Sequence, residues 1–108
     1  MTKDTEKAFV ILYSEYLRRR KFGTAKNQAV RFEDEKIGKI DAFSTWNQQD
    51  ISYCLRELSR LGFVKIDIVG NAELREQGIE YMEQKPKEYF SAFCGVVRGI
   101  VDLISAFL

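Results

Sequence analysis

Residues 51–82 read ISYCLRELSRLGFVKIDIVGNAELREQGIEYM and hold the most informative pattern in the chain. In their first part, apolar residues recur at the three- and four-residue spacing of one helical face: Ile51, Cys54, Leu55 and Leu58. Gly62 then follows Leu61, in the position where a glycine commonly ends a helix. Upstream, Thr45 and Gln48 have the spacing of a capping box, so a helix is predicted from Thr45 to Leu61.

The second part of this stretch predicts a β-hairpin followed by another helix. Phe63 to Val69 alternates between two sets of side chains, one of them apolar, as in a strand with one buried face. Gly70-Asn71 indicates a tight turn, after which Ala72 to Leu74 can pair with the first strand. A short helix is predicted from Glu76 to Gln84, and Pro86 prevents it from continuing.

Outward from this stretch, the N-terminal part predicts one long helix and a less regular connection. The helix is capped by Asp4 or Thr5, ends near Gly23, and carries apolar residues on one face: Phe9, Leu12, Tyr13, Tyr16 and Leu17. Residues 28–32 could form a short strand, and residues 33–40 a short helix or an irregular connection. A chain of 108 residues with 45% hydrophobic residues is expected to form a single core.

This order of elements resembles the winged helix of bacterial regulators of the MarR and PadR kind. In those regulators a recognition helix of the form xxLxxLxxxG precedes a hairpin called the wing, and LTxxGxxxL opens the next helix. The corresponding stretches here are ISYCLRELSRLGFVKIDI and ELREQGIEYM. The resemblance implies a mainly α (α+β) winged helix-turn-helix over residues 1–85, with an added apolar C-terminal helix over residues 86–108. Two departures are Arg75, where the family has Thr or Ser, and a wing without a basic residue between Val69 and Glu73.

The resemblance also implies double-stranded DNA as the partner, read by the exposed face of the helix that follows Thr45. Asn and Gln can bind adenine, and Arg can bind guanine, through paired hydrogen bonds. The candidate base-contacting residues are Gln48, Gln49, Ser52, Tyr53 and Arg56. A solvated polar face without a partner is the alternative interpretation. Trp46, in the first turn, is expected either to pack in the core or to contact a partner.

Charge is unevenly distributed along the chain, although the net charge is +1. Residues 18–40 hold eight basic residues against three acids, whereas from residue 70 onward six acids face four basic residues. Basic residues that contact phosphates supply the sequence-independent part of DNA affinity. The candidates for such contacts are Arg18, Arg19, Arg20, Lys21, Lys26 and Arg31. Interaction of the run Arg18–Lys21 with the dipole of the first helix is an equally good structural explanation.

The segment after Pro86 predicts one last helix, whose apolar face covers about half of its circumference. A face of this width is difficult for so small a domain to bury alone, so we expect a homodimer. The candidate dimerisation residues are Phe90, Phe93, Val97, Ile100, Val101, Ile104, Phe107 and Leu108. Closure of the chain's own core, or docking of another protein, is the alternative. A membrane partner is not expected, because Arg98 and Asp102 interrupt the apolar segment.

No residue pattern in the chain predicts catalysis, a metal or a cofactor. Histidine is absent, the glycines form no phosphate-binding loop, and the acidic residues lack the spacing of metal ligands. Cys54 and Cys94 lie far apart without a CxxC motif, and no signal peptide is visible, which favours the cytoplasm. We therefore expect a non-enzymatic DNA-binding transcriptional regulator of a bacterium or phage, acting as a homodimer. A winged-helix module that binds another protein instead of DNA is the alternative.

Overall fold

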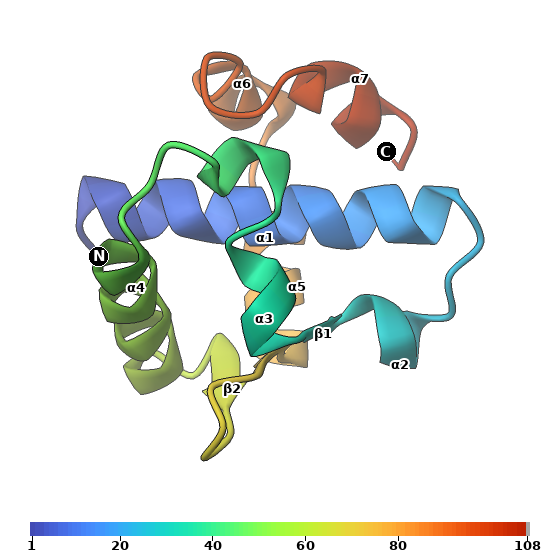
Figure 1. Cartoon of the computed structure of the whole chain (residues 1–108). Helices are drawn as coiled ribbons and strands as arrows, with labels where there is room; N and C mark the ends of the chain where they lie inside the picture. Colours follow the sequence, from blue (N-terminus) through green and yellow to red (C-terminus); the bar gives the residue numbers. More distant parts are fainter. Residues whose placement is uncertain (108) are drawn as a thin grey trace.

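A computed structural model describes residues 1–107 of the chain. Within them the protein is mainly helical with a small three-stranded antiparallel sheet, which confirms the predicted fold class at this level. The first helix, α1 (Lys3–Lys21), crosses the middle of the molecule (Figure 1). The C-terminal helices lie along one side of α1, and α4 (Gln48–Arg60), α5 (Glu76–Glu83) and the sheet lie on the other.

The central position of α1 explains why it is buried on nearly all sides and not along one stripe. The run from Ala8 to Leu12 is fully buried, and Tyr13, Tyr16 and Leu17 are buried as well. The helix begins after Thr2, whose hydroxyl oxygen accepts a hydrogen bond from the Thr5 backbone N–H at 3.2 Å. The N-cap is therefore Thr2 and not Asp4 or Thr5, while the end of the helix agrees with the prediction.

The connection between α1 and α4 consists of short pieces. These are α2 (Lys26–Ala29), β1 (Arg31–Phe32), α3 (Asp34–Ile37) and a 3-10 turn, η1 (Asp41–Phe43). The turn continues beyond η1, because the Trp46 backbone N–H donates to the Phe43 carbonyl at 3.0 Å. Thr45 thus belongs to the turn, the predicted capping box does not form, and α4 is capped by Asn47 instead.

The sheet has the strand order β1-β3-β2, with β2 (Val64–Ile66) and β3 (Ala72–Leu74) forming the predicted hairpin. β1 adds a third strand along β3, where the sequence predicted a two-stranded ribbon. Across the sheet, Glu73 lies opposite Arg31 on one side and Lys65 on the other. Side chains alternate along the strands, so this row points outward while Phe32 and Ala72 are buried.

Two glycines allow the helices to join the sheet closely. Gly62 has a φ of 82°, in the left-handed region, and turns the chain from α4 into β2. Gly78 packs α5 against the start of the hairpin, because a Cβ at this position would lie 2.5 Å from the Phe63 carbonyl oxygen. The Phe63 ring forms a cluster with those of Phe9 and Tyr81, at centroid distances of 5.2 and 4.8 Å, and these two rings lie 5.8 Å from each other. These contacts fix the hairpin relative to α1.

The C-terminal segment folds as two short helices, α6 (Lys87–Ser91) and α7 (Ile100–Ser105), and not as the single helix expected after Pro86. Gly99 precedes α7 with a φ of 74°, so the chain changes direction where the helical pattern predicted continuity. The segment folds back along α1 and buries part of its apolar residues there (Figure 1). Within residues 1–107 we find no helix that combines the length and the apolar character needed to cross a membrane.

Candidate nucleic-acid interface

The predicted reading helix, α4, has one face in the core and one face in solvent. Its buried residues are the four that the periodicity predicted, Ile51, Cys54, Leu55 and Leu58, and they face α1 and β2. The opposite face presents all five candidate base-contacting residues as exposed side chains: Gln48, Gln49, Ser52, Tyr53 and Arg56. The structure thus brings the whole predicted set together on one surface.

The charge of this face follows from the position of each residue around the helix. At 3.6 residues per turn the five candidates span an arc of about 140°, and both acidic residues of the helix, Asp50 and Glu57, lie outside it. Arg60 lies inside the arc, one turn after Arg56, and is exposed. This arc of α4 therefore carries two arginines and no carboxylate, while the exposed Asp50 lies about 60° beyond its edge at Tyr53. Sequence reasoning did not include Arg60, although its four-residue spacing from Arg56 was visible.

The first turn of α4 is held in place by its neighbours. The Asn47 side-chain oxygen accepts a hydrogen bond from the Gln49 backbone N–H at 2.8 Å. Trp46 is half-buried and meets the Phe43 ring edge-on, with 5.2 Å between ring centroids. Of the two expectations for Trp46, packing against the core is the one that this contact supports. Gln48 and Gln49 therefore project from a turn whose backbone is already fixed.

The predicted phosphate-contacting residues are mostly engaged with the chain itself. Arg18 binds Glu15 at 2.6 Å, and Arg20 donates to the Thr24 carbonyl at 3.0 Å. Lys26 forms an ion pair with Glu76 at 2.7 Å, and this hydrogen bond raises the pKa of the Lys26 ammonium. The hydrogen bond from Glu15 likewise raises the pKa of Arg18.

Arg19 is the most firmly held member of this set. Its guanidinium donates to the carbonyl oxygens of Ala29 and Arg31 at 3.2 and 2.5 Å. It also lies over the Phe32 ring, 4.4 Å from the centroid. These contacts join the end of α1 to α2 and β1, so Arg19 is a structural residue in this fold.

The remaining two residues of the set are exposed and form no ion pair within the described part of the chain: Lys21 and Arg31. Lys21 is the last residue of α1, which is about 28 Å long. The other end of α1 is the one that contacts α4, because the Thr2 backbone N–H donates to the Glu57 carboxylate at 3.1 Å. Arg31 lies instead on the outward row of the sheet beside Glu73 and Lys65. The structure therefore separates the run at the end of α1 from α4. It adds Lys65 as a candidate that sequence reasoning missed.

The predicted dimerisation residues divide into three groups. Phe90, Phe93, Ile100 and Ile104 are buried in the core of the chain itself. Val97 and Val101 are half-buried, and Phe107 is 45% exposed. Leu108 lies outside the described residues. Half of the predicted set thus closes this chain's own core, which was the alternative interpretation of the segment.

The two cysteines and the acidic side chains are the candidates for a reactive or metal-binding arrangement. Cys54 is buried, and burial raises the pKa of its thiol, while Cys94 is exposed. Within residues 1–107, no three His, Cys, Asp or Glu side chains are grouped so that they could hold a metal ion.

No family model matches the chain, and no curated protein or solved structure shows significant similarity to it.

Proposed function

We propose that this chain is a winged-helix module that binds double-stranded DNA, with α4 as its recognition helix in the major groove. From α4 to α5 the chain contains a helix, a glycine, a hairpin and a further helix. This is the order that the resemblance to MarR- and PadR-type regulators implies. In that arrangement α4 is the element that reads bases.

The exposed face of α4 carries the proposal. A helix that enters the major groove passes between two rows of phosphates, where a carboxylate is repelled and an arginine is attracted. The arc from Gln48 to Tyr53 presents Gln48, Gln49 and Arg56, which can bind base edges, and the acidic residues Asp50 and Glu57 lie outside it. A merely solvated helix face needs no such separation of its arginines from its carboxylates.

Two further cations are positioned for contacts with the DNA backbone. Arg31 and Lys65 flank Glu73 on the outward row of the sheet, and Lys65 belongs to β2, against which α4 packs. Arg60 extends the basic character along α4 toward the hairpin. In this proposal these three residues replace the run at the end of α1 as phosphate contacts.

The test is binding of a labelled random-sequence duplex by fluorescence anisotropy, from low to physiological salt. We expect an affinity that falls steeply as salt rises, because phosphate contacts release counterions. The Ser52→Glu variant places one carboxylate in the centre of the exposed face and should abolish binding. Ser105→Glu makes the same change on α7, on the other side of α1, and should bind like the wild type.

The second candidate function is a module that binds another protein. It is favoured by one observation, the apolar tip of the hairpin, where Ile68 and Val69 are 102% and 70% exposed. No duplex binding at low salt, or equal binding by Ser52→Glu and the wild type, would contradict the DNA-binding proposal and leave this candidate.

We also propose homodimer formation through the C-terminal segment, although fewer of the predicted residues are available for it than the sequence indicated. The residues that a second copy could contact are Phe107 and, in part, Val97 and Val101, because the other described members of the set are in the core. Light scattering on the wild type and on Phe107→Ser tests this pairing. A cytoplasmic location and the absence of catalysis remain expectations of the same proposal.

A further inference from the structure

The tip of the β2–β3 hairpin, residues 67–71, is an apolar projection. Ile68 and Val69 expose 102% and 70% of their surface, more than nearly all other large apolar side chains of the described chain. Two adjacent β-branched residues at the end of a hairpin gain nothing from solvent. Exposed apolar residues of this kind are typical of a contact with a partner.

The hairpin tip is also firmly built. One oxygen of the Asp67 carboxylate accepts hydrogen bonds from the backbone N–H groups of Val69, Gly70 and Asn71, each at 2.9 Å. The Asn71 side chain donates to the other oxygen at 3.0 Å and accepts from the Asp34 backbone N–H at 2.8 Å. The tip is thus tied to α3, and its docking requires little further ordering.

Two carboxylates, those of Asp67 and Asp34, lie beside this apolar tip. Asp67 is exposed, and the hydrogen bonds from Asn71 and its neighbours lower the pKa of its carboxyl group. The Asp34 carboxylate lies against Gly70, 2.9 Å from where a Cβ would stand. Lys65, the cation of the hairpin, belongs to β2 and lies opposite Glu73 in the ladder, outside the tip. A surface that receives the tip therefore needs an apolar floor and a basic rim.

The chain itself contains such a surface between α1, η1 and the C-terminal segment. This cationic hollow has a volume of about 730 Å³, and its floor is formed by apolar side chains: Ile11, Ile40, Ala42, Val96, Val97 and Leu103. Five cations line it against two carboxylates. The cations are Arg18, Arg19, Lys36, Lys39 and Arg98.

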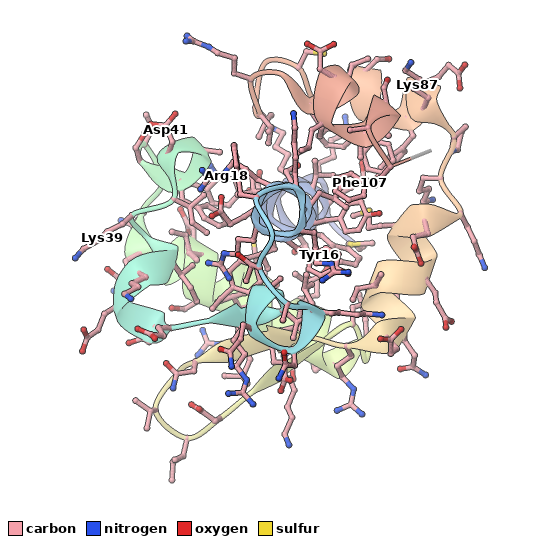
Figure 2. The ribbon with its side chains drawn as sticks, turned by 90° about the vertical axis from the view of Figure 1, so that its right-hand side faces the viewer. Tyr16, Arg18, Lys39, Asp41, Lys87 and Phe107 are labelled. Carbon is pink, nitrogen blue, oxygen red and sulfur yellow. The ribbon has the colours of Figure 1, made fainter. Side chains whose placement is uncertain are left out.

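Lys39 and Arg98 are the rim residues best suited to a carboxylate from outside. Both are exposed, and neither forms an ion pair within residues 1–107. Figure 2 shows Arg18, Lys39 and Asp41 on one side of α1, above the hairpin, which projects downward and away from them. The hairpin tip of a molecule therefore does not reach its own hollow.

We propose that the hairpin tip of one copy docks in the cationic hollow of a second copy, with Ile68 and Val69 on the floor and Asp67 facing Lys39 and Arg98. The two surfaces match in apolar character and in sign of charge. Because they are different surfaces, the contact is heterologous and can repeat from copy to copy. It is also small, so association is expected to be weak and to depend on concentration. Neither surface includes the exposed face of α4, so the inference does not depend on DNA binding.

Sedimentation velocity over a wide concentration series tests the contact. The wild type should associate as concentration rises. Ile68→Ser with Val69→Ser removes the apolar tip, and Lys39→Glu with Arg98→Glu reverses the rim; each double variant should weaken the association constant by at least about tenfold. Phe22→Ser removes a side chain that is 76% exposed elsewhere and should associate like the wild type. Circular dichroism confirms that each variant is folded.

Mixing the two double variants is the decisive experiment. The tip variant keeps an intact hollow and the rim variant keeps an intact tip, so the mixture should regain association that neither variant shows alone. The proposal is overturned if the wild type stays monomeric throughout, if the tip variant associates as strongly as the wild type, or if the mixture does not associate. Loss of association in Phe107→Ser with full association of the tip variant would assign pairing to the C-terminal segment and also overturn it.

Discussion

The end of α1 and the exposed residues of α4 and the sheet include similar basic side chains but use them differently. At the end of α1, Arg18, Arg19 and Arg20 bind groups of the chain itself. On the other surface, Arg56, Arg60 and Lys65 are exposed and form no ion pair within the described residues. The region that is richer in basic residues along the sequence is therefore the less available to a partner.

The difference arises from where a helix end meets the rest of the chain. The last carbonyl groups of α1 accept from backbone N–H groups of the turn, whereas the chain after α1 presents carbonyl groups that accept from the side chains of Arg19 and Arg20. The exposed face of α4 has no such neighbours, because its backbone is satisfied within the helix. The number of cations in a sequence segment is thus not a measure of the charge that it offers to phosphate.

The largest effect is expected for Arg19. Replacing it in Arg19→Ala removes two hydrogen bonds from a charged donor and the contact with Phe32, and should lower the free energy of unfolding by about 3 kcal/mol. Arg18→Ala is the matched control, because its exposed pair with Glu15 should contribute less than about 0.5 kcal/mol. Urea denaturation measures both. Equal stability of the two variants would contradict the structural role of Arg19.

The next effect sharpens the comparison on the other surface. Arg56→Ala removes a residue positioned to bind a base edge and should weaken binding to a selected duplex by about 2 kcal/mol, or about thirtyfold. Its stability should change by less than about 0.5 kcal/mol, because the side chain is exposed. Arg18→Ala loses the same charge and should bind DNA like the wild type. Anisotropy measures both affinities. Weaker binding by Arg18→Ala than by Arg56→Ala would indicate that the end of α1 is the DNA interface instead.

How far the sequence predicted the fold follows from how local each signal is. From Ile51 to Leu74 the helical spacing, Gly62 and the alternation after it act within a few residues, and the structure has the helix and the hairpin there. The segment after Pro86 has an equally clear helical pattern, but its outcome depends on α1. Phe90 and Ile104 both reach the core only because the chain breaks near Gly99 and folds back.

The candidate site shows the same division. The exposed face of α4 could be predicted because burial of Ile51 and Leu58 decides where Gln49 and Arg56 point. The fate of Arg19 could not, because its acceptors are carbonyl groups 10 and 12 residues away that only the tertiary fold brings near. Exposure of Ile68 could not be predicted either, because the alternating pattern predicted a strand up to Val69 and β2 ends at Ile66.

A smaller effect concerns the salt dependence of DNA binding. Arg31→Gln and Lys65→Gln should each reduce the slope of log affinity against log salt by about 1, because each removes one phosphate contact. Arg20→Gln, whose guanidinium already binds the Thr24 carbonyl, should leave the slope unchanged. Anisotropy titrations at several salt concentrations measure the slopes. A lower slope in Arg20→Gln alone would show that the engaged arginines contact phosphate after all.

The smallest effect is expected for Lys26, which lies between the two kinds of basic residue, because it is exposed and yet forms an ion pair within the chain. Its ion pair with Glu76 raises the pKa of the ammonium above its usual value of 10.5, so the stabilisation is present below that pH and is lost as pH rises through the raised pKa. Both side chains are largely exposed, so the pair should contribute less than about 0.5 kcal/mol. A double-mutant cycle of Lys26→Gln and Glu76→Gln by urea denaturation, below and above this pH, isolates the pair from the other lysines. The coupling should vanish at the higher pH, and a coupling that persists there would exclude the ion pair as its source. Because so weak a pair exchanges partners readily, we expect Lys26 to be the engaged cation that leaves Glu76 for a phosphate in the proposed DNA complex, whereas the contacts of Arg19 keep it in the fold.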